Sequence, residues 1–447
     1  KGTTTGTGLD LTMKTGSSLL LTDVSTATGT GRTIPFTNIT PPIAPGTSTL
    51  KNAQSTPEIV ATLNGASGDY FYVTLKGADV KIDENIDLSV GTNKLNKVSI
   101  YDSNITVENG KTIQDGATPN VAASTNLVRQ KYILGVNNGR TLTNNGTITL
   151  NSTSLTSNEL KVLVAMGKNT AGTIASKAIN NGTITSKINK GIAIYASDGA
   201  EGTNKSNKSI TMDGDGAFGM VGSNADTTNE GNITVNGTSA TGMYSTEPVA
   251  TPPITPTTIA INRGTITTTG DKNIGMVAKN SNITNDTTGI IKLNNSTENV
   301  GMYSEGPKGT ITNNGKIVMT GDKAVGIVSE GAGNIINLGG TGSSDITVGT
   351  NGIGVYASGT QSKVNFTSNT GVEIKDKGAG IYVANGSVIN PNGHTFEIKY
   401  TGSANESGTG ILYDSTATNT TDVDIVNTSS DKGIVGIYTT GGTLTNT

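Results

Sequence analysis

The sequence predicts an all-β protein, a right-handed parallel β-helix with three short strands per coil and about 27 residues per repeat. Three observations support this fold: the composition, the repeat, and corners too short to hold helices. The 447 residues include 60 Gly, no Cys and no Trp, and only 33% of them are hydrophobic. This composition does not suit one large spherical core, whereas a solenoid needs only a thin slice of core in each repeat.

The first element of the repeat is a short strand with a central Gly, followed by Ile, Met or Val, then Tyr or Val, then a small residue. The 243 residues from Ala193 to Gly436 hold nine intervals between its copies, a mean of 27. The ten copies begin at Ile192, Phe218, Thr241, Ile274, Val300, Val325, Ile353, Ala379, Thr409 and Val435. A fixed period of this length is typical of stacked solenoid coils.

Two further elements lie between these copies. One is a strand that ends at Asn-x-Gly and is followed by another alternating strand, as at 179–184, 261–266 and 311–319. We expect its Asn-Gly pairs to supply the positive φ angles of a sharp corner. The other is a corner that contains Asp-Lys, at 270–272, 321–323, 376–377 and 431–432.

Each coil therefore holds three strands of four to six residues, and like strands recur with like. This order indicates parallel stacking about 4.8 Å apart, and parallel crossovers are almost always right-handed. Period two places the residue before the Gly and the Ile or Met after it on one face, and the Gly and Tyr or Val on the other. We expect Met302, Ile327 and Ile381 to face inward.

Three segments differ in regularity. Residues 1–60 are Thr- and Pro-rich and are predicted to be an irregular N-terminal segment, because Pro cannot join a central strand. Residues 61–130 are predicted to form imperfect coils, and 131–447 a regular β-helix that is truncated at its C-terminus. We expect the fragment to be a monomer from a longer protein.

Charge and cysteine content exclude some functions. The chain has 31 basic and 34 acidic residues and no basic stripe, so we expect no nucleic-acid partner. The sequence has no run of 18 apolar residues, so no segment is expected to cross a membrane as a helix. The absence of Cys suits an exported chain that must stay free of disulfides before translocation.

No catalytic or metal site is evident, and we expect no enzyme activity, no cofactor and no metal. The single His394 flanks a turn and has neither a second His nor a Cys to join it. Asp213 and Asp215 resemble part of a calcium loop, but they align with the Asp-Lys corner. Asp422 and Asp424 alternate along one strand and form only a weak pair for glycoside hydrolysis.

Two features suit binding. The first is an outward column of tyrosines, which offers aromatic faces to sugars or proteins; its members are Tyr195, Tyr244, Tyr303, Tyr356, Tyr382 and Tyr438. Alternatively, these rings pack on one another and only stabilise the ladder. The second is a loop in the longest repeat that contains Pro248, Pro252, Pro253 and Pro256, which must leave the ladder. This loop is a candidate binding loop or a neutral spacer.

The repeat includes motifs such as Val325-Gly326-Ile327-Val328-Ser329 and Ile311-Thr312-Asn313-Asn314-Gly315. In these motifs, the repeat sequence resembles the passenger regions of large fusobacterial autotransporter adhesins. This type V family includes arginine-inhibitable and galactose-inhibitable adhesins. The resemblance covers about residues 130–447 and implies export, display on the outer membrane or secretion, and a C-terminal outer-membrane barrel in the parent protein. It implies bacterial or host cell-surface receptors or glycans as partners, and it identifies no binding residue.

Three functions fit this fold: an adhesin passenger, an inert stalk that holds a binding tip, and a polysaccharide depolymerase or lyase. All three use β-helices, so fold alone does not separate them. The sparse acidic residues disfavour the enzyme, and the resemblance favours the adhesin.

Overall fold

A computed structural model shows an all-β parallel β-solenoid of about ten turns, with three sheets, about 26 residues per turn, and no helix in the part of the chain that it describes. This confirms the predicted fold class. The structure describes residues 9–13, 18–22, 33–35, 46–51, 59–65, 72–76, 79–82, 85–87, 98–101, 104–115, 132–151, 160–249, 255–294, 297–340, 345–403, 406–421, 423–427 and 434–446.

The chain forms two compact units, Lys1–Glu201 and Gly202–Thr447. We number the three sheets in the order in which each coil visits them. Sheet 1 holds the Gly-Ile-Tyr strands, sheet 2 the strands that end in Asn, and sheet 3 the strands that follow the Asn-Gly corner. The predicted segment limits at 60 and 130 stay predictions.

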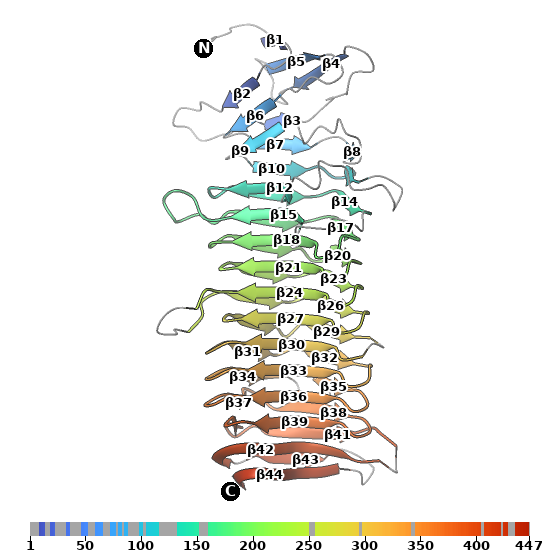
Figure 1. Ribbon diagram of the computed structural model, residues 1–447, viewed down its shortest axis with the longest axis vertical. Coiled ribbons are helices and arrows are strands. Elements are labelled where there is room, and N and C mark those ends of the chain that lie inside the picture. The colour runs from blue at the N-terminus through green and yellow to red at the C-terminus, as the bar shows by residue number, and fades with distance from the viewer. Residues whose placement is uncertain are drawn as a thin grey trace. The chain divides into compact units, whose positions relative to one another are not determined.

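In the second unit each sheet is a parallel stack, and Figure 1 shows its sheet 1 strands one above another from green to red. Sheet 1 consists of β21 (Phe218–Ser223), β24 (Thr241–Thr246), β27 (Ile274–Lys279), β30 (Val300–Glu305), β33 (Val325–Glu330), β36 (Ile353–Ser358), β39 (Ala379–Ala384), β42 (Gly408–Thr421) and β44 (Ile434–Asn446). Sheet 2 consists of β22 (Asp226–Asn229), β25 (Ile259–Asn262), β28 (Asn282–Asn285), β31 (Thr310–Asn313), β34 (Ile335–Leu338), β37 (Lys363–Phe366) and β40 (Val388–Asn390). Sheet 3 consists of β20 (Ser209–Met212), β23 (Asn232–Val235), β26 (Thr265–Thr268), β29 (Ile290–Leu293), β32 (Lys316–Met319), β35 (Ile346–Val348), β38 (Thr370–Ile374), β41 (Thr395–Tyr400) and β43 (Asp424–Asn427).

The first unit repeats this order with fewer regular coils. Its three stacks contain β12 (Tyr132–Asn137), β15 (Lys161–Met166) and β18 (Ile192–Ser197); β3 (Thr33–Pro35), β7 (Asp79–Ile82), β10 (Asn104–Val107), β13 (Thr141–Asn144) and β16 (Lys177–Asn180); and β8 (Ile86–Asp87), β11 (Thr112–Gln114), β14 (Thr147–Leu150) and β17 (Thr183–Ser186). Two further small sheets are formed by β1 (Leu9–Met13), β5 (Ile59–Gly65) and β4 (Gly46–Lys51), and by β2 (Ser18–Thr22), β6 (Tyr72–Lys76) and β9 (Val98–Tyr101). The strand β4 pairs antiparallel with β5. The strand β19 (Glu201–Asn204) begins at the last residue of this unit.

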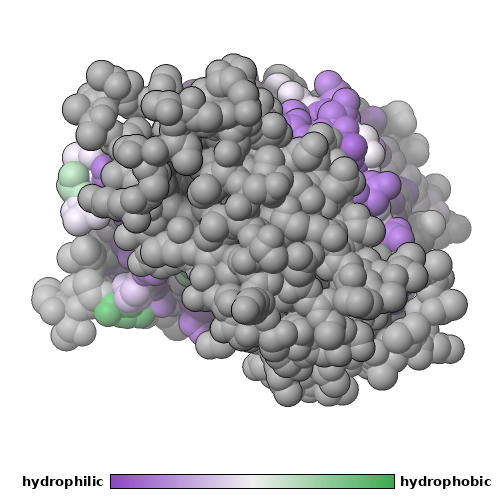
Figure 2. Space-filling view, turned by 90° about the horizontal axis from the view of Figure 1, so that it is seen from above, coloured by the Kyte–Doolittle hydropathy of each residue, from purple (hydrophilic) through white to green (hydrophobic). Residues whose placement is uncertain are grey.

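The core is a narrow column of aliphatic side chains. Met302, Ile327 and Ile381 are all 0% exposed, which confirms that the residue after the sheet 1 Gly faces inward. Outward positions on sheets 2 and 3 are mostly Thr, Asn and Lys. In the view from above, most of the residues that Figure 2 colours are hydrophilic. Apolar residues at every second position hold each short strand against the core.

The sheet 1 Gly does not share the outer face with Tyr, so that part of the predicted pattern is wrong. A methyl group on Gly275 would lie 2.7 Å from Cγ2 of Ile291, a core residue, and 2.6 Å from the carbonyl oxygen of Gly301. Gly275 and Met276 are both buried, whereas Ile274 before them is half-buried. The pleat is therefore locally broken at Gly, and the residue before it lies on the outer face.

The Asn-Gly corner also differs from the prediction, because neither Asn181 nor Gly182 has a positive φ. Gly is needed there because a methyl group on Gly182 would overlap the carbonyl oxygen of Gly146 in the adjacent coil. Positive φ angles do occur in the Asp-Lys corner, at Lys272 (58°), Lys323 (55°) and Lys377 (57°). Close backbone approach, and not left-handed geometry, therefore requires the Gly after Asn.

The Asn of that corner forms a buried hydrogen-bond ladder. In the second unit each side-chain nitrogen donates to the side-chain oxygen one coil further on, at 2.8 Å, through Asn204, Asn229, Asn262, Asn285 and Asn313. The first unit holds the equivalent pair Asn144 and Asn180, at 2.9 Å. After Asn313 the column continues with the apolar residues Leu338 and Phe366.

Candidate binding surface

The outer face of sheet 1 in the second unit carries an alternating column of Tyr and Val, which we call the tyrosine stripe. Strand register places these residues on successive coils in the order Val221, Tyr244, Val277, Tyr303, Val328, Tyr356, Tyr382, Leu412 and Tyr438. The predicted column is therefore continuous in this unit. Its role in binding stays a prediction.

Within the stripe, the valines are nearly buried and the tyrosines are the residues exposed to solvent. Val221, Val277 and Val328 are only 7%, 6% and 9% exposed, although they lie on the outer face. The tyrosines at 244 through 382 are half-buried, and Tyr438 is 55% exposed. The outward Val side chains are thus almost covered, whereas the tyrosine rings remain partly accessible.

Some aromatic rings in the stripe contact one another. Tyr356 and Tyr382 occupy adjacent coils, and their ring centroids lie 5.3 Å apart in an edge-to-face arrangement. Tyr244 meets Phe218 in the same way at 5.8 Å. These contacts support the structural alternative in part, since such pairs stabilise a fold by roughly 0.5–1.5 kcal/mol beyond their burial.

A second apolar column runs beside the tyrosines. It consists of the half-buried apolar residues that precede the sheet 1 Gly in five successive coils, namely Ile274, Val300, Val325, Ile353 and Ala379. Together, the tyrosine stripe and this second column form an apolar strip that is two residues wide over at least five coils. An apolar strip of this length with polar margins has the anatomy of an interaction surface.

Carboxylates border the tyrosine side of the stripe. The Tyr303 hydroxyl donates to Oε2 of Glu330 at 3.1 Å, and Lys279 forms an ion pair with Glu305 at 3.1 Å. Burial, and then the charges of Glu330 and Glu305, raise the pKa of Tyr303 to about 12. Burial and Asp414, which accepts from the Tyr382 hydroxyl at 3.3 Å, raise the pKa of Tyr382. These rings therefore stay neutral and act as hydrogen-bond donors.

Sequence reasoning did not identify these carboxylates. The signal was available, because Glu305 and Glu330 stand two residues after Tyr303 and Val328 in the same strands. Period two places such residues on one face.

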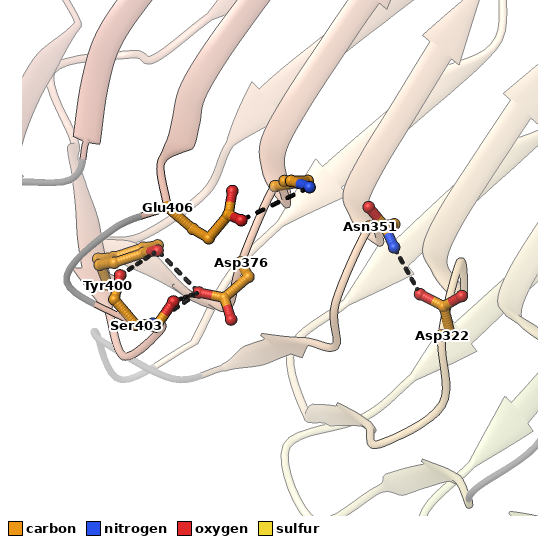
Figure 3. Close-up of polar contacts among 7 residues, drawn as sticks. Asp322, Asn351, Asp376, Tyr400, Ser403 and Glu406 are labelled. Atoms are coloured by element: carbon orange, nitrogen blue, oxygen red, sulfur yellow. Dashed lines mark hydrogen bonds and ion pairs between the residues drawn. The ribbon is translucent and has the colours of Figure 1, made fainter.

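The Asp-Lys corners form the opposite border, since each lies just before a residue of the second column, as Lys272 lies two residues before Ile274. Figure 3 shows polar contacts at two of these corners. Asp322 accepts from Nδ2 of Asn351 at 2.8 Å, and Asp376 accepts from the Tyr400 hydroxyl at 2.9 Å and the Ser403 backbone N–H at 2.6 Å. Lys377 approaches Glu406 at 3.6 Å. Each Asp therefore ties its corner to the next coil, which fixes the edge of the stripe.

The first unit contains one member of the predicted column. Tyr195 pairs in register with Val164, and Nζ of Lys161 lies 4.6 Å from the centroid of its ring. The face of this ring is thus engaged by a cation.

The proline loop is described only at its ends. Pro248 is exposed and Pro256 is buried, whereas Pro252 and Pro253 lie outside the described residues. Glu247 closes the base of the loop by accepting from the backbone N–H groups of Thr257 at 2.8 Å and Thr258 at 3.0 Å. Burial opposes ionisation of Glu247, but these hydrogen bonds outweigh it and lower its pKa.

The polar residues that we weighed for metal binding or catalysis take structural positions where they are described. Asp213 and Asp215 accept from Asn236 at 2.7 Å and Thr238 at 2.8 Å, which confirms that they belong to the Asp-Lys corner. The His394 backbone N–H donates to Pro391, closing a turn as predicted. Asp422 and the corner at 431–432 lie outside the described residues.

Within the described ranges, no group of three or more His, Cys, Asp or Glu could hold a metal ion. The same ranges hold no helix with the length and apolarity needed to cross a membrane.

Residues 72–337 match the family model described as the BigA third pectate lyase-like domain. This is a bacterial autotransporter-type adhesin family. No curated protein and no solved structure matches the chain significantly. The family model names BigA, so the narrower resemblance to fusobacterial adhesins stays a prediction. Because the match covers more than half of the chain, the protein belongs to the BigA third pectate lyase-like domain family.

Proposed function

We propose that this β-solenoid is the surface-displayed passenger of an autotransporter and acts as an adhesin, with the tyrosine stripe as its contact surface. The family match supports an adhesin-type, surface-exposed or secreted protein. The observation that carries the assignment to this face is the row of partly exposed tyrosines, with the half-buried Ile and Val residues of the second column beside them, on an otherwise Thr- and Asn-rich exterior. The partners we propose are receptors or glycans on bacterial or host cells.

We propose an adhesive and not a catalytic role, although the family name refers to pectate lyases. In support, several described corner carboxylates hold adjacent coils together. Asp271 accepts from the Thr297 backbone N–H at 2.9 Å, and Asp286 pairs with Arg263 at 3.0 Å. A lyase or hydrolase needs carboxylates that face substrate.

The test is a triple variant, Tyr303→Ser, Tyr356→Ser and Tyr382→Ser, compared with the wild type in a cell-adhesion assay. The matched control changes three outward residues of sheet 2, with Thr228→Ser, Thr284→Ser and Thr312→Ser. We expect adhesion to fall sharply in the first variant only, while circular dichroism still reports β structure in both.

Two outcomes would contradict this role. If adhesion fell only in proportion to a lower melting temperature, the tyrosines would be ladder residues. If a folded variant adhered as well as the wild type, the stripe would not be the contact surface, and a stalk function would be favoured.

A further inference from the structure

The order of residues in the tyrosine stripe has its own period. From Val221 to Tyr356 the column alternates strictly, so Tyr244, Tyr303 and Tyr356 each lie two coils apart. Tyr382 breaks this phase because it directly follows Tyr356. Adjacent strands of a sheet are about 4.8 Å apart, so in-phase rings recur every ~9.6 Å along the stripe.

This distance matches a polypeptide in the polyproline II conformation. That helix has three residues per turn and rises about 3.1 Å per residue, so equivalent side chains recur every ~9.3 Å. A proline at every third position would therefore meet successive tyrosines with a mismatch of only about 0.3 Å per period. Proline-rich segments commonly dock on aromatic-lined surfaces in this way.

The surroundings of the rings favour proline over a sugar chain. Between the in-phase tyrosines lie Val277 and Val328, and beside them lie the aliphatic residues of the second column, such as Val300 and Val325. Aliphatic surface would leave sugar hydroxyls without hydrogen-bond partners, which costs free energy, whereas a pyrrolidine ring loses nothing there.

The charges beside the rings restrict the partner further. Among the described residues, the tyrosine-side border carries Glu305, Glu330 and Asp414 against Lys279, which Glu305 already engages. This border repels an acidic ligand and suits neutral or basic residues between the prolines.

We propose that the tyrosine stripe binds a proline-rich polypeptide in the polyproline II conformation, laid along the column with one proline per in-phase tyrosine. This inference rests on the proposed adhesive function and names its ligand class. The ligand backbone has no internal hydrogen bonds, so its polar groups can stay solvated while the prolines pack on the tyrosine rings. It loses little conformational entropy on binding because it is already extended.

The test uses the full chain and a fluorescent twelve-residue polyproline peptide, with binding followed by anisotropy. Tyr303→Val should weaken binding at least about three-fold, because one aromatic contact is lost while the column keeps a residue that it already uses. Tyr132→Val, which removes an exposed ring outside the stripe, should bind like the wild type.

A swap variant tests the spacing itself. Tyr303→Val combined with Val328→Tyr keeps the composition of the stripe but moves one ring by one coil, so the two-coil period is lost. We expect it to bind as weakly as Tyr303→Val, with an unchanged melting temperature. If the swap bound the peptide as well as the wild type, spacing would not matter and the inference would be overturned.

Two further outcomes separate this inference from the proposed function. If the wild type bound no polyproline but bound chitohexaose, a β-1,4-linked sugar chain, the ligand class would be wrong while loss of adhesion in the triple Ser variant could still uphold the adhesin. If polyproline bound in the expected pattern while adhesion did not depend on the stripe, the inference would stand and the proposed function would fall.

Discussion

The side-chain nitrogen of Asn262 lies 2.8 Å from the side-chain oxygen of Asn285 in the next coil, and neither side chain is exposed to solvent. Asn262 also accepts from Asn229 at 2.8 Å and donates to the backbone oxygen of Gly264 at 3.2 Å. The buried Asn262 side chain therefore forms hydrogen bonds with the Asn side chains of both neighbouring coils and with the backbone of its own corner. Such a chain holds adjacent coils in register, because a shift by one residue would leave every member unpaired.

Replacing Asn262 by Ala should destabilise the protein by about 2 kcal/mol or more, since it leaves buried polar groups on both neighbours without partners. Asn232→Ala is the control, because the Asn232 side chain is exposed on the outer face of β23. Chemical denaturation of both variants measures the difference. Equal stability of the two would mean that the ladder does not hold the coils together.

The core prediction concerns Ile327, which is 0% exposed in β33. Ile327→Asp should cost several kcal/mol, because an unpaired carboxylate would enter the apolar column. Each coil contacts only its neighbours, so the loss should appear first as local opening around β33. Hydrogen exchange measures this opening, and Thr312→Asp on the half-buried outer face of β31 is the control. Protected amides throughout β30, β33 and β36 in Ile327→Asp would contradict this view of the core.

The sheet 1 glycines give a third prediction. In Gly275→Ala the new methyl group would meet the Gly301 carbonyl oxygen at 2.6 Å and Ile291 at 2.7 Å, so backbone must shift. Overpacking of this kind typically costs 1–3 kcal/mol. Gly436 occupies the same position in β44, where a methyl group would meet nothing within 4 Å. Thermal melting should therefore drop for Gly275→Ala and stay nearly unchanged for Gly436→Ala.

These glycines also show where sequence reasoning ends. The repeat spacing and strand alternation were sufficient to predict the fold and the inward direction of Met302 and Ile327, because both depend on the local period. They placed Gly275 on the wrong face, because the pleat is broken by contact with another coil. Likewise, an Asn-Gly pair commonly indicates a positive φ, but the restriction at Gly182 comes from the backbone of Gly146, which is distant in sequence.

The candidate surface was predicted to a similar extent. The outward direction of the tyrosines follows from the strand period, and the structure agrees. The two-coil alternation of Tyr303 and Tyr356 was present in the sequence but has meaning only once stacking fixes the distance between coils. The hydrogen bond from Tyr303 to Glu330 joins two strands and could not be derived from either alone.

The last prediction concerns acid stability and Asp376. The Ser403 backbone N–H, then the Tyr400 hydroxyl, stabilise its ionised carboxylate and lower its pKa below the ordinary value of 3.8. A carboxylate with a lowered pKa in the folded state stabilises the fold at pH values above its ordinary pKa, and this contribution is lost as the pH falls through the folded-state pKa. Asp376→Asn should therefore be less stable than the wild type at pH 7, and the difference should shrink below about pH 4.

The control for this change is Asp198→Asn, which alters an exposed carboxylate at another corner without changing its shape. Thermal unfolding from pH 2.5 to 7 measures both variants against the wild type. The wild type and Asp198→Asn should lose stability in parallel on acidification, whereas Asp376→Asn should lose less because the group that titrates has been removed. If the gap between wild type and Asp376→Asn were constant over this range, the contribution of Asp376 would not depend on its charge. The Asp376 side chain would then act only as a hydrogen-bond acceptor for Tyr400 and Ser403, whatever its charge, and the tie between these coils would be as strong in acid as at neutral pH.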